Sequence, residues 1–269
     1  MPDDRPVAIP YPPSRRLTFD VGRIGRTKHH VQALLEVDVT EARRRIRQGR
    51  QSGARVSFTA WLIKSVADCV ARHPAAAGFN DSGRNRVLAF EDVDVSIVVE
   101  KAVEGARVPL PLVIRGANRK ALEAIREEIE AAKSQVVVDE RGWVLGAARG
   151  TTGLRWFVRL PQWLRLTLMR ALVLRDPRRA RDLMGTVMLT TAGMVGHARG
   201  WIVPFGMHPL CLALGSINEQ PAVREGRVEP REVLHLTALI DHDVIDGVPA
   251  ARFVDDLVER LEAGVGLEP

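Results

Sequence analysis

The most informative segment of this chain is Asp241-His242-Asp243-Val244-Ile245-Asp246-Gly247, and an apolar run at 233–240 leads directly into it. The run predicts a buried strand, and the recurring apolar residues of 253–261 predict an amphipathic helix after the turn. Gly247 can supply the tight backbone path between the two elements. Catalytic groups commonly lie in such strand-end loops, so His242 is the first candidate for a functional side chain.

The apolar pattern elsewhere predicts strands and helices that alternate loosely along the chain. Prolines at 109 and 111 indicate a strand at a sheet edge or a bulge. The expected helices are capped by Thr40, Ser57 and Asn118. We expect an α/β fold, a two-layer sandwich around a mixed β-sheet. The strands are expected at about 29–38, 87–89, 93–99, 108–114, 186–190 and 210–214, and the helices at about 40–51, 57–72 and 118–133.

Length and composition are those of a globular protein. The 269 residues allow one large domain, which we place at 17–269 after a proline- and arginine-rich extended arm at 1–16, with a loop at 22–25. Cys69 and Cys211 are the only cysteines and lie far apart, so we expect neither a disulfide framework nor a metal site. This cysteine usage, and an N-terminus without an apolar signal segment, favour a cytoplasmic location.

The net charge of +6 comes from one segment of the chain. Residues 151–185 hold eight of the 39 basic residues and two of the 33 acidic ones, which leaves 31 of each elsewhere. A nucleic-acid-binding protein would carry a broader basic surface or a recognition motif, and neither is found in the sequence. We therefore do not expect nucleic acid as a partner.

Acyl transfer between thiols needs a base for the attacking thiol and a hydrogen-bond donor for the oxyanion that forms. Histidine suits the first role, because its intrinsic pKa lies near neutral pH. Asp246, four residues after His242, can hold the local geometry through a charge pair. The spacing also allows a plainer interpretation, in which Asp246 only caps the last helix and His242 is an ordinary surface residue.

The same segment resembles the C-terminal signature of the dihydrolipoamide acyltransferases, the core components of 2-oxo acid dehydrogenase complexes. The matching pattern is Asp241-His242-x-x-Ile245-Asp246-Gly247-x-Pro249-Ala250-Ala251-x-Phe253. A more distant similarity connects it to chloramphenicol acetyltransferase. The likeness covers most of 15–265 and implies a chloramphenicol acetyltransferase-like fold, because further motifs match in the same order at 36–40, 58–64, 92–99, 115–122 and 190–196.

The resemblance also implies roles for single residues. His242 would be the general base, Asp246 its structural support next to Gly247, and Thr190 the oxyanion donor at a position where the family usually has serine. Arg16 would be a supporting arginine from the N-terminal arm. In this family the active sites lie between the subunits of a trimer, and CoA or acyl-CoA is a substrate. No metal is implied.

The chain departs from the family pattern before and within the catalytic region. No lipoyl or subunit-binding domain precedes it, so we expect no covalently attached lipoyl group in this chain. This leaves the acyl acceptor open, with a separate lipoyl-bearing protein as one candidate partner. Asp243 stands where the family usually has arginine, which could raise the pKa of His242 or cost an intersubunit contact. The tail at 264–269 makes a poor apolar plug, so we expect a homotrimer rather than a larger core.

A basic helical insertion at about 137–184 is the third departure, and it has three interpretations. Its tryptophans and arginines at 151–183 are compatible with peripheral membrane contact. Its arginines could instead form a lid over CoA phosphates. In the plainest interpretation it is a helical hairpin that packs on the protein with its arginines in water. It is too short and too rich in arginine to span a bilayer.

The leading hypothesis is therefore an acyltransferase that moves an acyl group between CoA and a dihydrolipoamide-like thiol or another small acceptor. The alternative is a non-catalytic scaffold or partner subunit of an acyltransferase or 2-oxo acid dehydrogenase assembly. Retention of His242, Asp246 and the Thr190 hydroxyl favours the enzyme, whereas Asp243 leaves room for the alternative.

Overall fold

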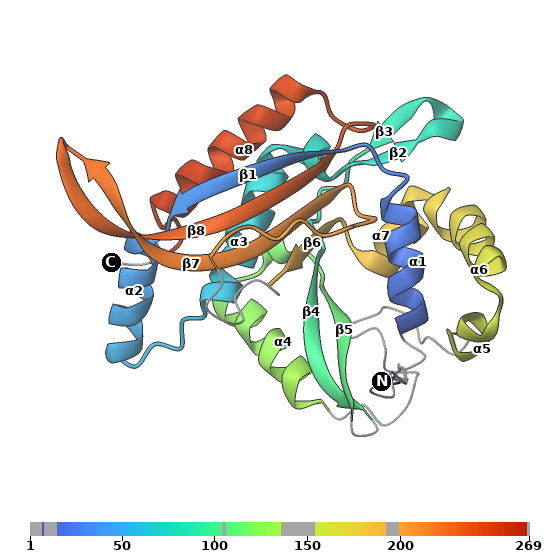
Figure 1. The fold of residues 1–269 in the computed structure, drawn as a ribbon, viewed down its shortest axis with the longest axis horizontal. Coiled ribbons are helices and arrows are strands. Elements are labelled where there is room, and N and C mark those ends of the chain that lie inside the picture. Colours follow the sequence, from blue (N-terminus) through green and yellow to red (C-terminus); the bar gives the residue numbers. More distant parts are fainter. Residues whose placement is uncertain (1–6, 8–14, 104–105, 136–153, 192–198, 268–269) are drawn as a thin grey trace, which may run out of the picture.

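The fold is organised around a mixed sheet of six strands (Figure 1). The computed structural model describes residues 7, 15–103, 106–135, 154–191 and 199–267. The sheet order is β1 (His30–Asp38), β8 (Arg227–Asp241), β7 (Leu210–Arg224), β6 (Val187–Thr190), β4 (Val95–Val103) and β5 (Ala106–Ile114). Strand β6 runs parallel to β4 and β7, and the other neighbours are antiparallel. The expected α/β fold with a mixed sheet is confirmed.

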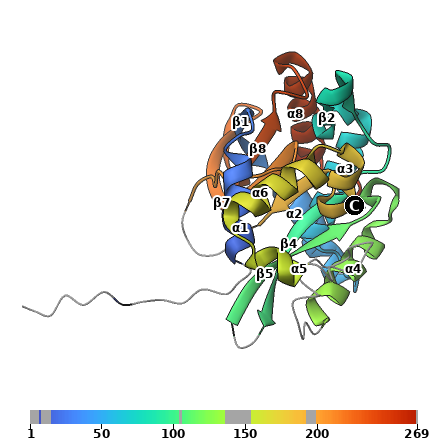
Figure 2. The ribbon, with the colours of Figure 1, turned by 90° about the vertical axis from the view of Figure 1, so that its right-hand side faces the viewer.

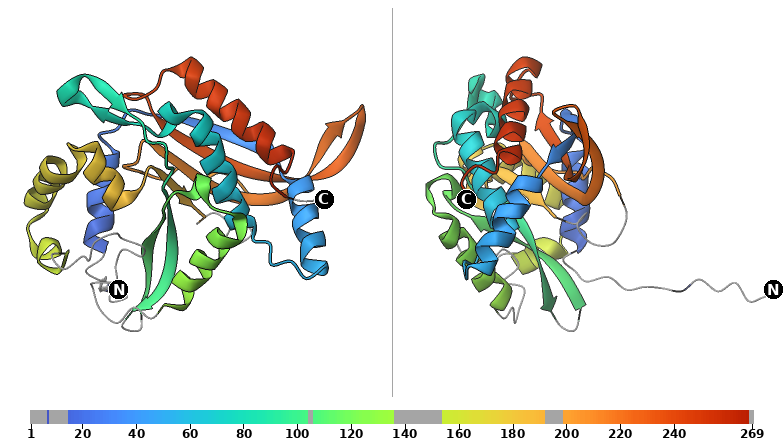
Figure 3. Two further views of the ribbon diagram at one scale, coloured as in Figure 1. Left: turned by 180° about the vertical axis from the view of Figure 1, so that it is seen from behind. Right: turned by 90° about the vertical axis from the view of Figure 1, so that its left-hand side faces the viewer.

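Four helices cover one face of the sheet, as Figure 1 and Figure 3 show from opposite sides. They are α2 (Thr40–Gln51), α3 (Phe58–Arg72), α4 (Leu122–Ser134) and α8 (Gly247–Glu262). Each turns an apolar stripe toward the sheet, and the fully buried side chains of α3 and α8 include Trp61, Leu62, Phe253, Leu257 and Leu261. Removing this apolar surface from water is the main force that holds the two layers together.

Strand β5 lies at one edge of the sheet, which confirms the interpretation of its prolines. Pro109 and Pro111 face Glu100 and Val98 of β4, its single neighbour in the sheet. A proline has no N–H to donate, and an edge strand needs no donor on its outer side. A separate short ribbon is formed by β2 (Phe79–Asp81) and β3 (Arg86–Leu88). Short 3₁₀ helices are found before this ribbon at Pro74–Ala77, between its strands at Ser82–Arg84, and between β5 and α4 at Ala117–Arg119.

Strands β7 and β8 continue far beyond the strands expected from the apolar runs, and their hairpin projects from the body of the protein (Figure 1). The hairpin turns at Glu225 and Gly226, whose φ angles of 49° and 78° are those of a two-residue hairpin turn with both residues left-handed. Most residues of this extension are exposed. An exposed ribbon needs no buried face, so the apolar pattern gave no signal for it.

Two of the expected helix caps lie at the start of α2 and α3. Ser57 caps α3 as expected, because its side chain accepts a hydrogen bond from the Ala60 N–H. The expectation for Thr40 is wrong. Thr40 is the first residue of α2, and its hydroxyl accepts from the Glu232 N–H at 2.8 Å. The hydroxyl therefore joins the helix to β8 instead of capping it.

The third expected cap, Asn118, is also wrong. Helix α4 begins only at Leu122. The Asn118 side-chain oxygen accepts from the Val93 N–H at 2.9 Å, and its amide donates to the Glu91 carbonyl at 3.0 Å. Asn118 thus satisfies the backbone that leads into β4, a role that depends on residues distant in sequence.

Helix α1 (Arg15–Gly25) corrects the description of the N-terminal region. The helix begins inside the expected arm and continues through 22–25, which we expected to be a loop. Its two glycines weaken the helical signal. Gly25 serves a packing need, since a Cβ atom there would lie 2.8 Å from the Gly206 carbonyl oxygen.

The described part of the insertion is helical and lies beside α1 (Figure 2). It consists of α5 (Leu154–Arg159), α6 (Gln162–Met169), a π-helical turn (Arg170–Leu174) and α7 (Pro177–Met184), while 136–153 lie outside the described residues. Arg165 is 4% exposed and donates from Nε and a terminal nitrogen to both carboxylate oxygens of Asp20 in α1, at 2.6 and 2.9 Å. At least this arginine is not on the water side, contrary to the plainest interpretation.

The Asp20–Arg165 pair predicts a large stability effect. Arg165→Leu leaves the Asp20 carboxylate buried without its partner, so we expect a loss of about 3 kcal/mol in the free energy of unfolding. The exposed Arg175 provides the control, and Arg175→Leu should change stability by less than about 0.5 kcal/mol. Urea unfolding followed by circular dichroism measures both. Equal stability of the two variants would contradict a structural role for the pair.

Candidate active site

The turn that carries His242 is held on both sides by backbone hydrogen bonds. Asp241 ends β8 opposite His30, the first residue of β1. The His242 N–H donates to the His29 carbonyl at 3.0 Å, and the Asp241 N–H donates to the Pro209 carbonyl at 2.9 Å. The backbone at His242 is thus fixed between the segments that lead into β1 and β7.

Two charged pairs reinforce this turn from the segment before β1. Lys28 Nζ lies 2.7 Å from the carboxylate of Asp241, which is fully buried. His29 Nδ1 lies 2.9 Å from the carboxylate of Asp243. The hydrogen bond from this carboxylate raises the pKa of His29, and its charge adds to the effect. The carboxylate of Asp243, which replaces the usual arginine of the family, therefore pairs with a histidine of its own chain.

The His242 side chain is exposed at the surface of the chain. No hydrogen bond to its ring is formed within the described residues. Asp246 is also exposed and stands at the N-cap position of α8, but its side chain makes no capping hydrogen bond. Asp246 therefore occupies the N-cap position, as the plainer interpretation requires, but it does not form the capping hydrogen bond. The side chains of His242 and Asp246 are both accessible to solvent.

Thr190, the candidate oxyanion donor, is the last residue of β6 and is partly buried. It faces Ala213 of β7, which in turn faces Thr237 of β8. Asp241 lies four residues farther along β8, about 13 Å at the usual rise per strand residue. The structure therefore does not bring Thr190 and His242 together within one chain.

The two supporting residues of the sequence prediction have other surroundings. Arg16 is exposed in α1, and its guanidinium donates to the Val158 carbonyl of α5 at 3.2 Å. This contact joins α1 to the insertion. Gly247 is the first residue of α8 and has no left-handed φ, and a Cβ atom there would meet nothing within 4 Å. The expected reason for this glycine, a tight backbone path, is thus wrong.

Further polar residues lie around the turn and come from other parts of the sequence. His208 is buried, its Nε2 donates to the Met184 carbonyl at 2.8 Å, and burial lowers the pKa of its ring to about 4. His30 Nε2 contacts the His208 carbonyl at 3.0 Å. Sequence reasoning missed Lys28, His29 and His208, because they lie far from His242 in the chain and belong to no motif with it.

A cavity of about 770 Å³ elsewhere in the chain does not include the candidate residues. Its lining comes from α2 and the segment after it, the middle of α3, the start of α4 and residues 265–267. Neither His242 nor Thr190 belongs to it. The exposed turn, and not this cavity, holds the chemistry that the sequence predicts.

Comparison with known proteins places the chain in a family. The model of the 2-oxoacid dehydrogenases acyltransferase catalytic domain matches residues 22–137 and 180–267. The chain belongs to this family. The interval between the two matched parts falls within the insertion, so the family model and the described helices α5 and α6 agree on where the chain differs.

Single relatives give the same picture. The chain is 25% identical over 216 residues to the dihydrolipoyllysine-residue acetyltransferase component of the pyruvate dehydrogenase complex of Mycoplasma pneumoniae, which covers 80% of this chain and 43% of that protein. This chain spans about half the length of the curated relatives it matches.

Two solved structures share the fold. A probable dihydrolipoamide acetyltransferase from Listeria monocytogenes aligns over 96% of this chain and 95% of its own, with a TM-score of 0.66 and 18% identity. The dihydrolipoamide acetyltransferase of Azotobacter vinelandii aligns over 97% of each chain, with a TM-score of 0.63 and 19% identity. That structure addresses the role in catalysis of a serine, a histidine and an asparagine four positions after the histidine.

The His29–Asp243 pair predicts a measurable change in titration. Asp243→Asn removes the carboxylate that raises the pKa of His29, so this pKa should fall toward its ordinary value of 6.5. In the native chain His29 is protonated below its raised pKa and then forms an ion pair with Asp243. The attraction between the two charges is lost as the pH rises through this pKa. NMR titration of the imidazole protons measures the shift, with Asp246→Asn as the control. An unchanged His29 titration in Asp243→Asn would show that the pair is not formed.

Proposed function

We propose that this protein is an acyltransferase that moves an acyl group between CoA and a thiol such as that of a dihydrolipoyl group, or another small acceptor. The observation that carries the proposal is the His242 turn. This chain belongs to a family of acyltransferase catalytic domains, and its His242 imidazole is exposed on a turn at the end of a strand. Backbone hydrogen bonds and the Lys28–Asp241 and His29–Asp243 pairs hold that turn in place. A fixed backbone with a free imidazole is what a general base needs.

The reaction follows from this arrangement. His242 takes the proton of the attacking thiol, and the thiolate forms a bond to the carbonyl carbon of the thioester. The carbonyl electrons move to oxygen, and the Thr190 hydroxyl donates a hydrogen bond to that oxyanion. When the intermediate collapses, the second sulfur leaves and receives the proton from His242. The same groups serve both directions of transfer, because each thiol is in turn the attacking and the leaving group.

The two groups are proposed to come from neighbouring chains of a homotrimer. Two observations support this. The ends of β6 and β8 that carry Thr190 and lead to His242 lie at different levels of the sheet, and the His242 side chain is exposed. Asp246, four residues after His242, is positioned to orient the base.

The acyl acceptor is proposed to be carried by a separate lipoyl-bearing protein. The relatives that the chain matches are components of dehydrogenase complexes. The alternative function, a non-catalytic scaffold or partner subunit of such an assembly, is favoured by Asp243. The pairing of Asp243 with His29 weakens that alternative, because the carboxylate contacts a histidine of the segment before β1 and not the His242 ring.

A second role is proposed for the insertion, contact with an anionic membrane surface. Trp156 and Trp163 are 70% and 69% exposed, although such large apolar side chains are usually buried. Exposed arginines accompany them, and the Arg159 guanidinium lies over the Trp156 ring at 5.7 Å. Tryptophan at the headgroup level with arginine toward anionic lipid is the arrangement of an interfacial helix. Among the described residues, no helix is long and apolar enough to cross a membrane.

The catalytic proposal predicts the effects of three substitutions. His242→Ala should lower the rate of acyl transfer by about 100- to 10,000-fold. Thr190→Val removes the hydroxyl and keeps the shape, so a loss of about 100- to 1,000-fold is expected. Thr190→Ser retains the hydroxyl and serves as the matched control. Release of CoA from acyl-CoA in the presence of dihydrolipoamide measures all three.

Each outcome of this assay has a clear meaning. Unchanged activity in His242→Ala would refute the mechanism. A folded wild-type protein that releases no CoA with any thiol acceptor would support the scaffold instead.

The membrane proposal predicts co-sedimentation of the wild-type protein with vesicles that contain phosphatidylserine, and not with purely zwitterionic vesicles. Replacing Trp156 and Trp163 together by alanine should reduce this binding several-fold. The helices should stay folded, because both tryptophans are exposed. Equal binding by the wild type and the double variant would refute the proposal, as would the absence of wild-type binding.

A further inference from the structure

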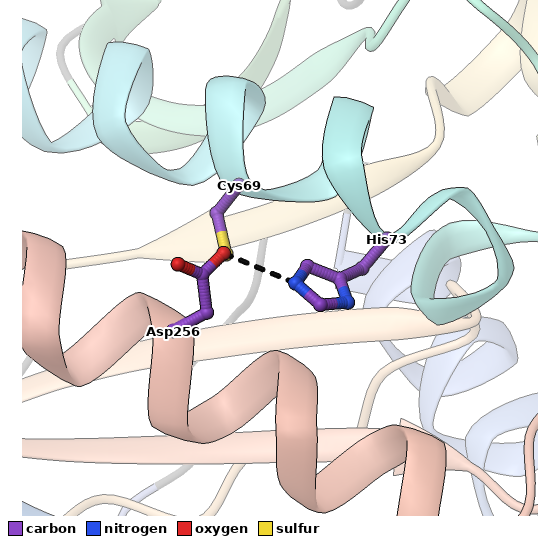
Figure 4. A group of neighbouring side chains, drawn as sticks. All are labelled: Cys69, His73 and Asp256. Atoms are coloured by element: carbon purple, nitrogen blue, oxygen red, sulfur yellow. Dashed lines mark hydrogen bonds and ion pairs between the residues drawn. The ribbon is translucent and has the colours of Figure 1, made fainter.

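Three side chains of different chemistry converge between α3 and α8, away from the His242 turn (Figure 4). Cys69 and His73 come from the end of α3, and Asp256 comes from α8. Cys69 Sγ lies 3.3 Å and His73 Nε2 lies 3.0 Å from one carboxylate oxygen of Asp256. The sulfur, nitrogen and oxygen atoms all lie within 4.8 Å of one another.

The position of these atoms follows from helix geometry. Residues four apart lie on the same face of a helix, so Cys69 and His73 point in one direction from α3. Helix α8 packs on that face, with Phe253 one turn before Asp256 and its ring 6.1 Å from the His73 ring. Two helices therefore hold three donor atoms around one point without a flexible loop.

The donor set matches a borderline transition-metal ion. Thiolate, imidazole and carboxylate are the ligands that Zn²⁺ binds, whereas Mg²⁺ and Ca²⁺ prefer oxygen alone. In a tetrahedral zinc site with bonds of about 2.0–2.3 Å, neighbouring ligand atoms lie about 3.5 Å apart. The two contacts to Asp256 are within about half an ångström of that spacing. Small rotamer adjustments would open the space for an ion.

The surroundings satisfy the further needs of such a site. The Arg72 guanidinium lies 2.7 Å from the same Asp256 oxygen that Cys69 and His73 contact, so metal binding there requires the guanidinium to move to the other carboxylate oxygen, where it would be an outer partner. His73 is the C-cap of α3, and the C-terminal end of a helix favours a cation. Cys69 is fully buried, while His73 and Asp256 are partly exposed, so a water molecule can complete the coordination from the solvent side.

We propose that Cys69, His73 and Asp256 bind one Zn²⁺-like divalent metal ion through Sγ, Nε2 and a carboxylate oxygen. The Cys69 thiol loses its proton to solvent when the sulfur–metal bond forms, and the imidazole binds with its proton on Nδ1. The metal's two positive charges are balanced by the thiolate and the carboxylate. The ion would join α3 to α8, the helix that begins at Gly247 directly after the His242 turn.

Titration of the full-length, reduced chain with Co²⁺ tests the proposal directly. A thiolate–cobalt charge-transfer absorption should appear and saturate at one ion per chain. Zn²⁺ should displace the cobalt, and Mg²⁺ should not. Cys69→Ser keeps a hydrogen-bonding group of similar size and should abolish the absorption, and Asp256→Asn should weaken binding. Cys211 is the other buried cysteine, so Cys211→Ser is the matched control and should leave the absorption intact.

A second measurement separates metal binding from folding. Zn²⁺ should raise the melting temperature of the wild type and of Cys211→Ser, and leave that of folded Cys69→Ser unchanged. If the folded wild type gives no charge-transfer absorption, the cluster is a hydrogen-bonded contact between two helices and the proposal is wrong. The same conclusion holds if Cys69→Ser retains the absorption. Neither result depends on acyltransferase activity.

Discussion

The register of the central strands determines where this protein can carry out chemistry. Thr190 ends β6 at the level of Thr237, whereas His242 follows the end of β8 beyond Asp241. A shift of one residue in a strand would turn every side chain to the opposite face, so the buried face of the sheet locks this register. In this register the two groups lie apart within one chain. Under the proposed function, catalysis therefore requires assembly of several chains. In the single chain the His242 ring is exposed, as a group that acts with a neighbouring chain must be.

Charge pairs around the turn resolve the departure at Asp243. A carboxylate beside a general base would be expected to perturb it. Here Asp243 pairs with His29 and the neighbouring buried Asp241 pairs with Lys28, so both carboxylates have partners in the segment before β1. The basic residues of that segment and the acidic residues of the turn form one unit. The insertion is anchored in a similar way, because the buried Arg165 and Asp20 join α6 to α1.

The sequence predicted the elements whose signal is local. The strand at 210–214, the cap at Ser57 and the final helix were correct, because apolar period and capping chemistry act over a few residues. The long polar hairpin was missed because it has no buried face. Thr40 and Asn118 were misassigned because their partners, Glu232 and Val93, lie elsewhere in the chain. The Cys69, His73 and Asp256 cluster was missed for the same reason, since its third member lies on another helix. His242 was found from its turn, whereas Lys28 and His29, which pair with Asp241 and Asp243 of that turn, were not.

The central claim is that His242 and Thr190 act together from neighbouring chains, and mixing two inactive variants tests it most directly. His242→Ala and Thr190→Val chains are unfolded together, refolded as mixed assemblies and assayed for acyl transfer. If the site lies between chains, random assortment of equal amounts restores about a quarter of the sites. Each site needs an intact His242 from one chain and an intact Thr190 from its neighbour, and about half of the chains supply each residue. If the site lies within one chain, no chain in the mixture has both residues. Activity no higher than that of the two variants alone would contradict the account.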